Sequence, residues 1–424
     1  MFRTVASIWC ISLVGALATV GLVSPRGTGA AGAFSENDEI FERVGSITLP
    51  AEEHNLYGAL IEPGGRHAYF SPATSPARVV KVDLHSFTRT GSLILDAGEA
   101  LWFAGAISPD GRYAYLGTSD SPAKIVKVDL ATFTRAGSIT LEEGENQIHS
   151  AIMAPDGRHV YFGTLTSPGR VVRINIENGM EHTGTITLGD GENELVSAVI
   201  APDGSYGYFG TRTRPGRVIK VDLPAFSRSG AITFEEGEDR LASSVIAPDG
   251  SNAYFGLDAA EGGVVRVNLN SFTRTGSVTF APAEHSVSSA VITPDGSHAY
   301  FGTNRLPISH VVKVRLAPLE RVGAIGFEWG ESSLFCAVMA PDGAHAYFGT
   351  ASFPASVVKV QVAETPPLPP WGREQGDLNE DGCVNFSDFV FLLEHWGTTV
   401  LGGEPLGFGD FLTLLEHWGD GPDC

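Results

Sequence analysis

The stretch PDGRHVYFGT (Pro155–Thr164), followed by RVVRINI (Arg170–Ile176) and GTITL (Gly184–Leu188), is a clear copy of a unit that the chain repeats seven times. Each unit carries a proline in its first turn, and successive marker prolines are 46 or 47 residues apart. These prolines are Pro63, Pro109, Pro155, Pro202, Pro248, Pro294 and Pro341. A period of this length, filled with short apolar runs and Gly-rich turns, is typical of a repeat architecture.

Each unit divides into four strand-like runs, which we call a, b, c and d in chain order. In the third unit these runs are Ser150–Ala154, His159–Thr164, Arg170–Ile176 and Thr183–Leu188. The Pro-Asp-Gly between a and b predicts a tight turn, because proline presets φ, aspartate bonds the turn backbone and glycine accepts positive φ. The c run is apolar at nearly every position, which indicates sheets covered on both faces, as stacked propeller blades are.

The two ends of the repeat array indicate how it closes. A d-type run, Arg43–Leu49, precedes the first a run, whereas the last unit has a (Cys336–Ala340), b (His345–Thr350) and c (Val357–Val362) but no d. An open solenoid would need atypical capping units, and none is visible. The sequence therefore predicts an all-β fold, a seven-bladed β-propeller over residues 34–363 that an N-terminal d strand closes.

The repeats resemble those of bacterial YVTN-type and lactonase-like β-propellers, in which a Pro-Asp-Gly turn is followed by an aromatic strand and a Val-rich strand. The resemblance covers residues 41–362 and implies the propeller fold. Members of that group include sugar-lactone hydrolases and surface proteins without known chemistry. We therefore expect an exported binding or display scaffold for a protein or glycan ligand. The alternative is a lactonase-like extracellular hydrolase that acts at the face of the d–a and b–c loops.

The N-terminal segment has the pattern of an export signal. Arg3 precedes an apolar run from Val5 to Val23, and Ala31–Ala33 is a small-x-small cleavage site. The sequence predicts a signal peptide over residues 1–33, with an uncleaved membrane anchor as the alternative. The remaining chain carries 26 basic and 49 acidic side chains, a net charge of −23, which repels nucleic acid and anionic membranes. We expect a secreted or cell-surface protein with no nucleic-acid partner and no membrane span in the mature chain.

A small module over residues 376–424 follows a proline-rich linker over residues 364–375. Its segment DLNEDGCVNFSD has oxygen-bearing side chains at positions 1, 3, 5, 9 and 12 and glycine at position 6, the spacing that Ca²⁺ requires. The expected ligands are Asp377, Asn379, Asp381, the backbone carbonyl of Cys383, Asn385 through a water, and Asp388. The sequence predicts one Ca²⁺ site, and the alternative is a solvated acidic turn.

This loop and the helix expected over Phe389–Trp396 resemble a type I dockerin repeat. A second copy, Gly409–Gly419, keeps the helix but has lost the loop. The resemblance implies an attachment module for a cohesin-like or other cell-surface protein. Phe386-Ser387 stands where dockerins often have the Ser-Thr pair of the cohesin contact. Cys383 and Cys424 are a candidate disulfide, because an exported compartment permits them to pair.

A glutamate stands ten residues before every marker proline, in the loop from one d run to the next a run. The seven are Glu53, Glu99, Glu145, Glu192, Glu238, Glu284 and Glu331. Ring closure would place them on one face, together with the basic b–c loop residues Arg78, Lys124, Arg170 and Arg217. These glutamates are ligand-face candidates, either as a mouth for a cation or cationic ligand or as structural carboxylates bonded between blades. Their identity in all seven copies favours the structural role, because repeat arrays depend on nearest-neighbour interfaces.

A catalytic site would break the symmetry of the repeat. The candidates near the d–a loops are Leu101–Phe103, His149, Trp329 and Phe335, which could form a ligand platform or fill the core. The sequence contains no Gly-x-Ser-x-Gly elbow, so we assign no catalytic residue. Four histidines share one repeat position in separate units, which indicates packing at strand ends, since zinc needs ligands that converge. They are His67, His159, His298 and His345.

Overall fold

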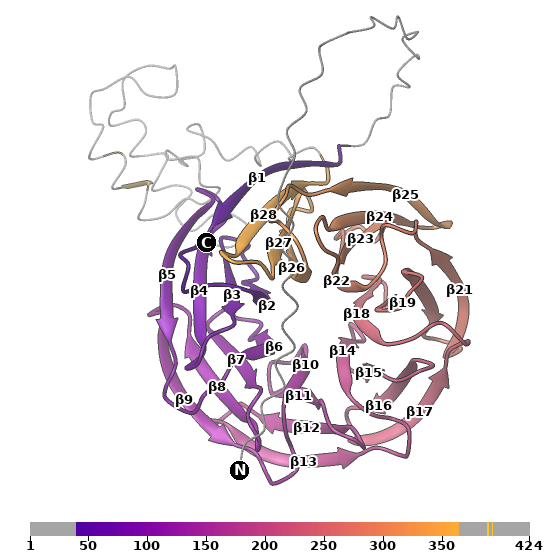
Figure 1. Ribbon diagram of the computed structural model, residues 1–424. Helices are drawn as coiled ribbons and strands as arrows, with labels where there is room; N and C mark the ends of the chain where they lie inside the picture. Colours follow the sequence, from indigo (N-terminus) through magenta and orange to yellow (C-terminus); the bar gives the residue numbers. More distant parts are fainter. Residues whose placement is uncertain (1–39, 364–387, 390–391, 393–424) are drawn as a thin grey trace, which may run out of the picture. The chain divides into compact units, whose positions relative to one another are not determined.

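The computed structural model describes residues 40–363, 388–389 and 392, and residues 40–363 form a seven-bladed β-propeller (Figure 1). In this range, 28 strands make seven four-stranded sheets, each antiparallel throughout. We number the blades in the order of the marker prolines. The predicted all-β architecture and the predicted number of blades are confirmed.

The strands of each blade are given from the inner strand beside the central channel to the outer strand. Blade 1 contains β2 (Leu56–Ile61), β3 (His67–Pro72), β4 (Arg78–Asp83) and β5 (Thr88–Ile94). Blade 2 contains β6 (Trp102–Ile107), β7 (Tyr113–Thr118), β8 (Lys124–Asp129) and β9 (Thr134–Thr140). Blade 3 contains β10 (Ile148–Met153), β11 (His159–Thr164), β12 (Arg170–Asn175) and β13 (Glu181–Thr187).

The remaining blades follow the same order. Blade 4 contains β14 (Leu195–Ile200), β15 (Tyr206–Thr211), β16 (Arg217–Asp222) and β17 (Ser227–Thr233). Blade 5 contains β18 (Leu241–Ile246), β19 (Asn252–Leu257), β20 (Gly263–Asn268) and β21 (Thr273–Thr279). Blade 6 contains β22 (Val287–Ile292), β23 (His298–Thr303), β24 (His310–Leu316) and β25 (Leu319–Gly326). Blade 7 contains β26 (Leu334–Met339), β27 (His345–Thr350), β28 (Ser356–Gln361) and β1 (Glu42–Thr48).

Blade 7 closes the ring with strands from both ends of the repeat array. β1 pairs antiparallel with β28, so that Glu42 lies opposite Gln361 and Thr48 opposite Ser356 (Figure 1). The N-terminal d strand thus completes the last sheet, as the sequence predicts. Closure covers the β28 edge that blade 7 would otherwise expose to pairing with another chain.

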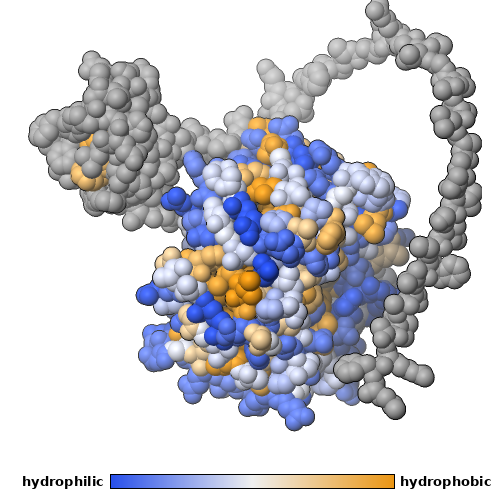
Figure 2. Space-filling model, turned by 60° about the vertical axis from the view of Figure 1, so that its left-hand side comes forward, coloured by the Kyte–Doolittle hydropathy of each residue, from blue (hydrophilic) through white to orange (hydrophobic). Residues whose placement is uncertain are grey.

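The hydrophobic core consists of seven clusters, one between each pair of neighbouring blades. Between blades 3 and 4, Val171 and Phe209 are fully buried against each other's sheets. Gly163 permits this close approach, because a Cβ there would overlap Ser150 of its own blade and Leu195 of blade 4. The outward surface is different, since Figure 2 shows mostly hydrophilic residues with smaller hydrophobic patches between them.

The inner strands of blades 3 and 7 start at Ile148 and Leu334, two residues earlier than the sequence predicts, and a β-bulge interrupts each of them. In blade 3 the register passes from Ile148 opposite Thr164 to Ser150 opposite Gly163, which leaves His149 as the extra residue. The same shift occurs in all the other inner strands. A bulge takes one residue out of the ladder and re-aims its side chain.

The predicted signal peptide, the proline-rich linker and most of the C-terminal module lie outside the described residues. Of that module the structure describes Asp388, Phe389 and Leu392, which are helical, and both Asp388 and Leu392 are buried. In the described part of the chain, no helix combines the length and hydropathy needed to span a bilayer.

Candidate functional site

The seven ligand-face glutamates are all buried, with exposed fractions of 9% or less. Six of them accept hydrogen bonds from an arginine on the outer strand of the blade that follows their loop. The pairs are Arg89–Glu53, Arg135–Glu99, Arg228–Glu192, Arg274–Glu238, Arg321–Glu284 and Arg43–Glu331. In blade 3 the arginine is absent. There Glu145 accepts a hydrogen bond from the Thr185 hydroxyl, and its carboxylate lies 3.1 Å from His182 Nε2.

The sequence offered backbone amides or the basic residues of the b–c loops as partners, whereas the charged side-chain partners are arginines of the outer strands. Lys124, Arg170 and Arg217 instead donate to backbone carbonyl oxygens of the d–a loops, for example from Lys124 Nζ to Gly98 O at 2.6 Å. The glutamates also bond their own loops, as when the N–H of Asp96 donates to Glu99 Oε2 at 2.9 Å. Each carboxylate therefore ties its d–a loop to an outer strand.

The ion pairs keep several of these carboxylates ionised. Burial raises the pKa of Glu99, but the hydrogen bonds from Arg135 and from the N–H of Asp96 outweigh burial and hold this pKa below its usual value. The same balance lowers the pKa of Glu192, Glu284 and Glu331. In residues 40–363, 388–389 and 392, no three His, Cys, Asp or Glu side chains are grouped so that they could hold a metal ion. A cation mouth made by the glutamates stays a prediction.

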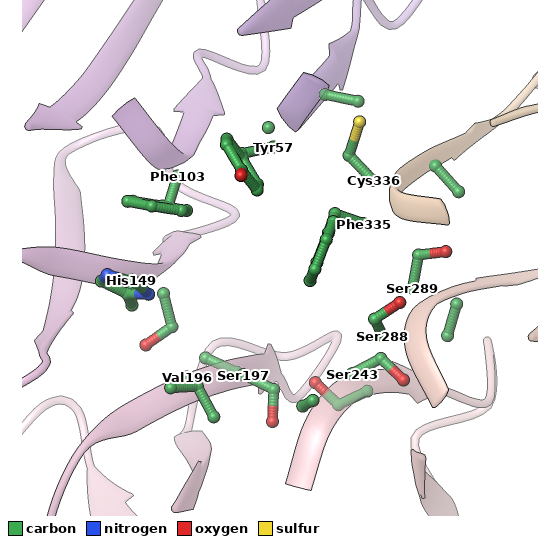
Figure 3. A pocket seen from close by; sticks show the side chains of 18 of the residues that line it. Tyr57, Phe103, His149, Val196, Ser197, Ser243, Ser288, Ser289, Phe335 and Cys336 are labelled. Carbon is green, nitrogen blue, oxygen red and sulfur yellow. The ribbon is translucent and has the colours of Figure 1, made fainter. Parts of the chain in front are cut away.

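The central channel is lined by the bulge residues of the seven inner strands, each six residues before a marker proline. They are Tyr57, Phe103, His149, Val196, Ala242, Ser288 and Phe335. They surround a cavity of about 240 Å³ (Figure 3). The glutamate position has one residue type in seven copies, whereas this position has six. The symmetry of the repeat breaks at the residues that face the channel.

Four aromatic rings from blades 7, 1, 2 and 3 form one side of the channel, which we call the aromatic wall (Phe335, Tyr57, Phe103 and His149). Tyr57 lies between Phe335 and Phe103, with its ring centroid 5.2 Å from each (Figure 3). Phe103 stacks on His149 with centroids 4.0 Å apart and an interplanar angle of 19°. Such contacts fix the ring orientations, because offset and tilted aromatic pairs attract each other.

The opposite side, from blades 5 and 6, is formed by small side chains and is called here the serine wall (Ser243, Ser244, Ser288 and Ser289). Ser288 donates from its hydroxyl to Leu334 O at 2.9 Å. The Oγ atoms of Ser243 and Ser289 are buried without a hydrogen-bond partner in the described part of the chain. Both Oγ atoms lie against a glycine of the neighbouring strand, Gly256 and Gly302, inside their own blades.

His149 is neutral at physiological pH in this setting. Burial and the nearby charge of Arg212 lower the pKa of His149 to about 4. A neutral imidazole offers one hydrogen-bond donor and one acceptor. The aromatic wall thus ends in a polar ring that adds no charge to the channel.

The structure sorts the symmetry-breaking residues that the sequence singled out. Phe103, His149 and Phe335 lie together on the aromatic wall, whereas Trp102 is fully buried and donates from its indole N–H to Arg78 O at 3.0 Å. Trp329 is 81% exposed and does not line the channel. Tyr57 was missed, although an alignment of the seven copies on their marker prolines places it at the same repeat position as Phe103.

The histidines at the shared repeat position do not converge. His67, His159, His298 and His345 begin the second strands of blades 1, 3, 6 and 7, in four different sheets. His67 Nδ1 lies 2.8 Å from Glu62 Oε1 in its own blade. Local contacts of this kind fit the predicted packing at strand ends.

Comparison with known proteins supports the fold and gives no information on the function. No protein-family model matches the chain, and no curated protein sequence matches it. Among solved structures, it is similar to a chain of the hydrazine synthase of Kuenenia stuttgartiensis, with a TM-score of 0.62 and 14% sequence identity. The match covers 79% of this chain and 100% of that one. At this identity the likeness shows a shared β-propeller fold.

Proposed function

We propose that the chain is an exported binding scaffold whose propeller holds a glycan in its central channel. The supporting observation is the bulge position, where an otherwise uniform repeat carries six different residue types. A bulge residue leaves the strand ladder, and these seven side chains face the channel. Their different chemistry is therefore available to contact a ligand in the channel. An aromatic wall opposite hydroxyl groups matches a sugar ring, which has C–H faces and hydroxyl edges.

The size of the channel favours a glycan over a protein ligand. Its volume of about 240 Å³ lies below the roughly 300–1,000 Å³ of sites for drug-sized molecules. One ring or one chain end fits such a space, whereas a folded protein does not. The residue types that line the channel, aromatic rings with a few hydroxyls, are those of small-molecule sites in general.

The alternative function, a lactonase-like hydrolase at this face, needs an acid, base or metal site beside the reacting atoms. The described residues that line the channel include His149 and several serines but no aspartate, glutamate, lysine or arginine. This composition supports binding over hydrolysis.

The channel proposal can be tested by saturation-transfer NMR with a panel of mono- and oligosaccharides on the full chain. Sugars that receive saturation from the wild type should lose most of that signal with Phe103→Ala, which removes the centre of the aromatic wall. Trp329→Ala is the matched control, because it removes an exposed aromatic outside the channel lining. Binding that survives Phe103→Ala, or that Trp329→Ala abolishes, would contradict a ligand in the channel.

We also propose that residues 376–424 form a calcium-stabilised, dockerin-like module that attaches the protein to a cell-surface or cohesin-like partner. Asp388 supports this assignment, because the last ligand of such a loop lies in the first turn of a helix and Asp388 is helical and buried. A bound Ca²⁺ would hold the loop folded through Asp377, Asn379, Asp381, Cys383 and Asn385 together with Asp388.

Calorimetric titration of the full chain with Ca²⁺ tests the module. We expect one site per chain, lost in Asp377→Ala and kept in Glu236→Ala, which removes an exposed carboxylate of the propeller. Equal calcium binding by wild type and Asp377→Ala would contradict the ligand assignment.

A further inference from the structure

A second cavity, of about 380 Å³, lies on blade 4 between the loop that precedes β14 and the loop between β15 and β16. Three arginines line it, Arg212, Arg214 and Arg217, with Glu194 as the one acidic residue among the lining residues. The chain as a whole has a net charge of −21. A concave site lined by three guanidinium groups and one carboxylate is therefore a local reversal of the general field of the protein.

This cluster breaks the symmetry of the repeat. Arg212 and Arg214 stand ten and twelve residues after their marker proline, and no other unit has a basic residue at either position. The equivalents of Arg212 are Ala73, Ser119, Leu165, Asp258, Asn304 and Ala351. The equivalents of Arg214 are Ser75, Ser121, Ser167, Ala260, Leu306 and Phe353. The blade framework does not need arginine at these positions, so a purpose particular to blade 4 explains them.

The guanidinium groups are only weakly engaged by the protein. In the described part of the chain, the Arg212 side chain makes no hydrogen bond or ion pair, and Arg214 Nε lies 3.8 Å from Asp239 Oδ2. Arg217 Nη1 donates a long hydrogen bond of 3.4 Å to Asp190 O. Most donors of the three groups are free to bind an anion, for which the planar guanidinium is well suited.

Blade 4 contributes residues to both the arginine cavity and the channel. Glu194 lines the arginine cavity and Val196 lines the channel, with one residue between them at the start of β14. The N–H of Arg212 donates to Glu194 O at 2.8 Å, which fixes the loop beside that strand. The charge of Arg212 also reaches His149 on the aromatic wall and contributes to its lowered pKa. A ligand in the channel can therefore extend an anionic group toward blade 4.

We infer that Arg212, Arg214 and Arg217 form an anion subsite at the channel mouth, so that the glycan is acidic, a sugar that carries a carboxylate or a sulfate. This inference rests on the proposed glycan site in the channel. The ring lies between the aromatic wall and the serine wall, and its anionic substituent accepts hydrogen bonds from the three guanidinium groups.

The test is calorimetric titration of the full chain with three probes. They are a tetrasaccharide of galacturonic acid, its carboxyl-reduced neutral counterpart, and a sulfated form of that counterpart. A charge-assisted hydrogen-bond pair should make an acidic probe bind about tenfold more tightly than the neutral one. Arg212→Gln/Arg214→Gln should remove this preference and leave neutral binding unchanged. Arg112→Gln/Arg158→Gln is the control, because it removes two exposed arginines from the turns on the opposite face.

Each outcome decides the inference. A preference for the uronate identifies a carboxylate site, a preference for the sulfated probe identifies a sulfate site, and both support it. Equal binding of acidic and neutral probes, or equal behaviour of the blade 4 and control variants, overturns the anion subsite and leaves the channel function standing. Binding of none of the probes also overturns it, and the Phe103→Ala comparison then decides the channel function separately. If the double variant fails to fold, Arg212→Gln alone gives the same comparison.

Discussion

Replacing Arg135 by methionine tests whether the buried glutamates hold the propeller together. Glu99 is 2% exposed and accepts hydrogen bonds of 2.6–3.1 Å from Arg135. Removing one partner of a buried ion pair costs about 3–5 kcal/mol, because the other charge stays buried and unpaired. The Arg135 side chain is 25% exposed, and Glu99 keeps the N–H of Asp96 as a partner. We therefore expect Arg135→Met to lower the free energy of unfolding by about 3 kcal/mol, near the lower end of that range.

The assay is urea unfolding of the full chain at pH 7, with Arg112→Met as control. Arg112 is 60% exposed, and its ion pair with Asp129 is long, at 3.8 Å. Its loss should therefore change the unfolding free energy by less than about 0.5 kcal/mol. The pKa of Glu99 is lower in the folded state, so its contribution is complete above the unfolded pKa of about 4.3. It is lost as the pH falls through the folded pKa, and the difference between wild type and variant should shrink there. A loss below about 1 kcal/mol at pH 7 would refute a structural role for the pair.

Three further predictions concern other parts of the chain. Gly163→Ala should lower stability by about 1–3 kcal/mol, because the added methyl group overlaps the neighbouring blade; an unchanged melting temperature would contradict this. His149 has a pKa of about 4, so the affinity of a channel ligand should be constant from about pH 5.5 to 8. A change in affinity centred near the ordinary pKa of histidine would contradict the neutral state of His149. Cys383 and Cys424 should appear as one linked peptide after non-reducing proteolysis of exported protein, and two alkylated thiols would exclude the disulfide.

The architecture could be predicted from the sequence because the same four-strand unit occurs seven times. The Pro-Asp-Gly turn at residues 155–157 forms as predicted, and Gly157 takes a φ of 67° there. Closure by β1 was predictable for a different reason: the unpaired d run at residues 43–49 is the strand that the last unit lacks. Both inferences depend on counting elements, which tolerates errors of one or two residues in their ends.

Details that depend on register could not be predicted in the same way. A bulge adds one residue to an inner strand, and the same bulge position holds His149 in blade 3 but Val196 in blade 4, so no residue type marks which residue leaves the ladder. The arginine partners of the glutamates were missed because the basic residues of the b–c loops were expected on the same face as the glutamates. The true partner, Arg135 for Glu99, lies 36 residues further along the chain on an outer strand. An arginine 36 or 37 residues after the glutamate in five of the seven units was the available signal.

Two neighbouring residues of β6 show how the bulge separates stability from binding. Trp102 is fully buried between blades and hydrogen-bonded to Arg78 O, so Trp102→Ala should cost about 3–5 kcal/mol. Phe103 faces the channel and loses only its contacts with Tyr57 and His149, so Phe103→Ala should cost about 1 kcal/mol. Unfolding of both variants by urea measures the contrast, and equal losses would contradict it. Because substitutions at the channel position cost little stability, each blade can present a different residue to a ligand while the buried framework remains the same.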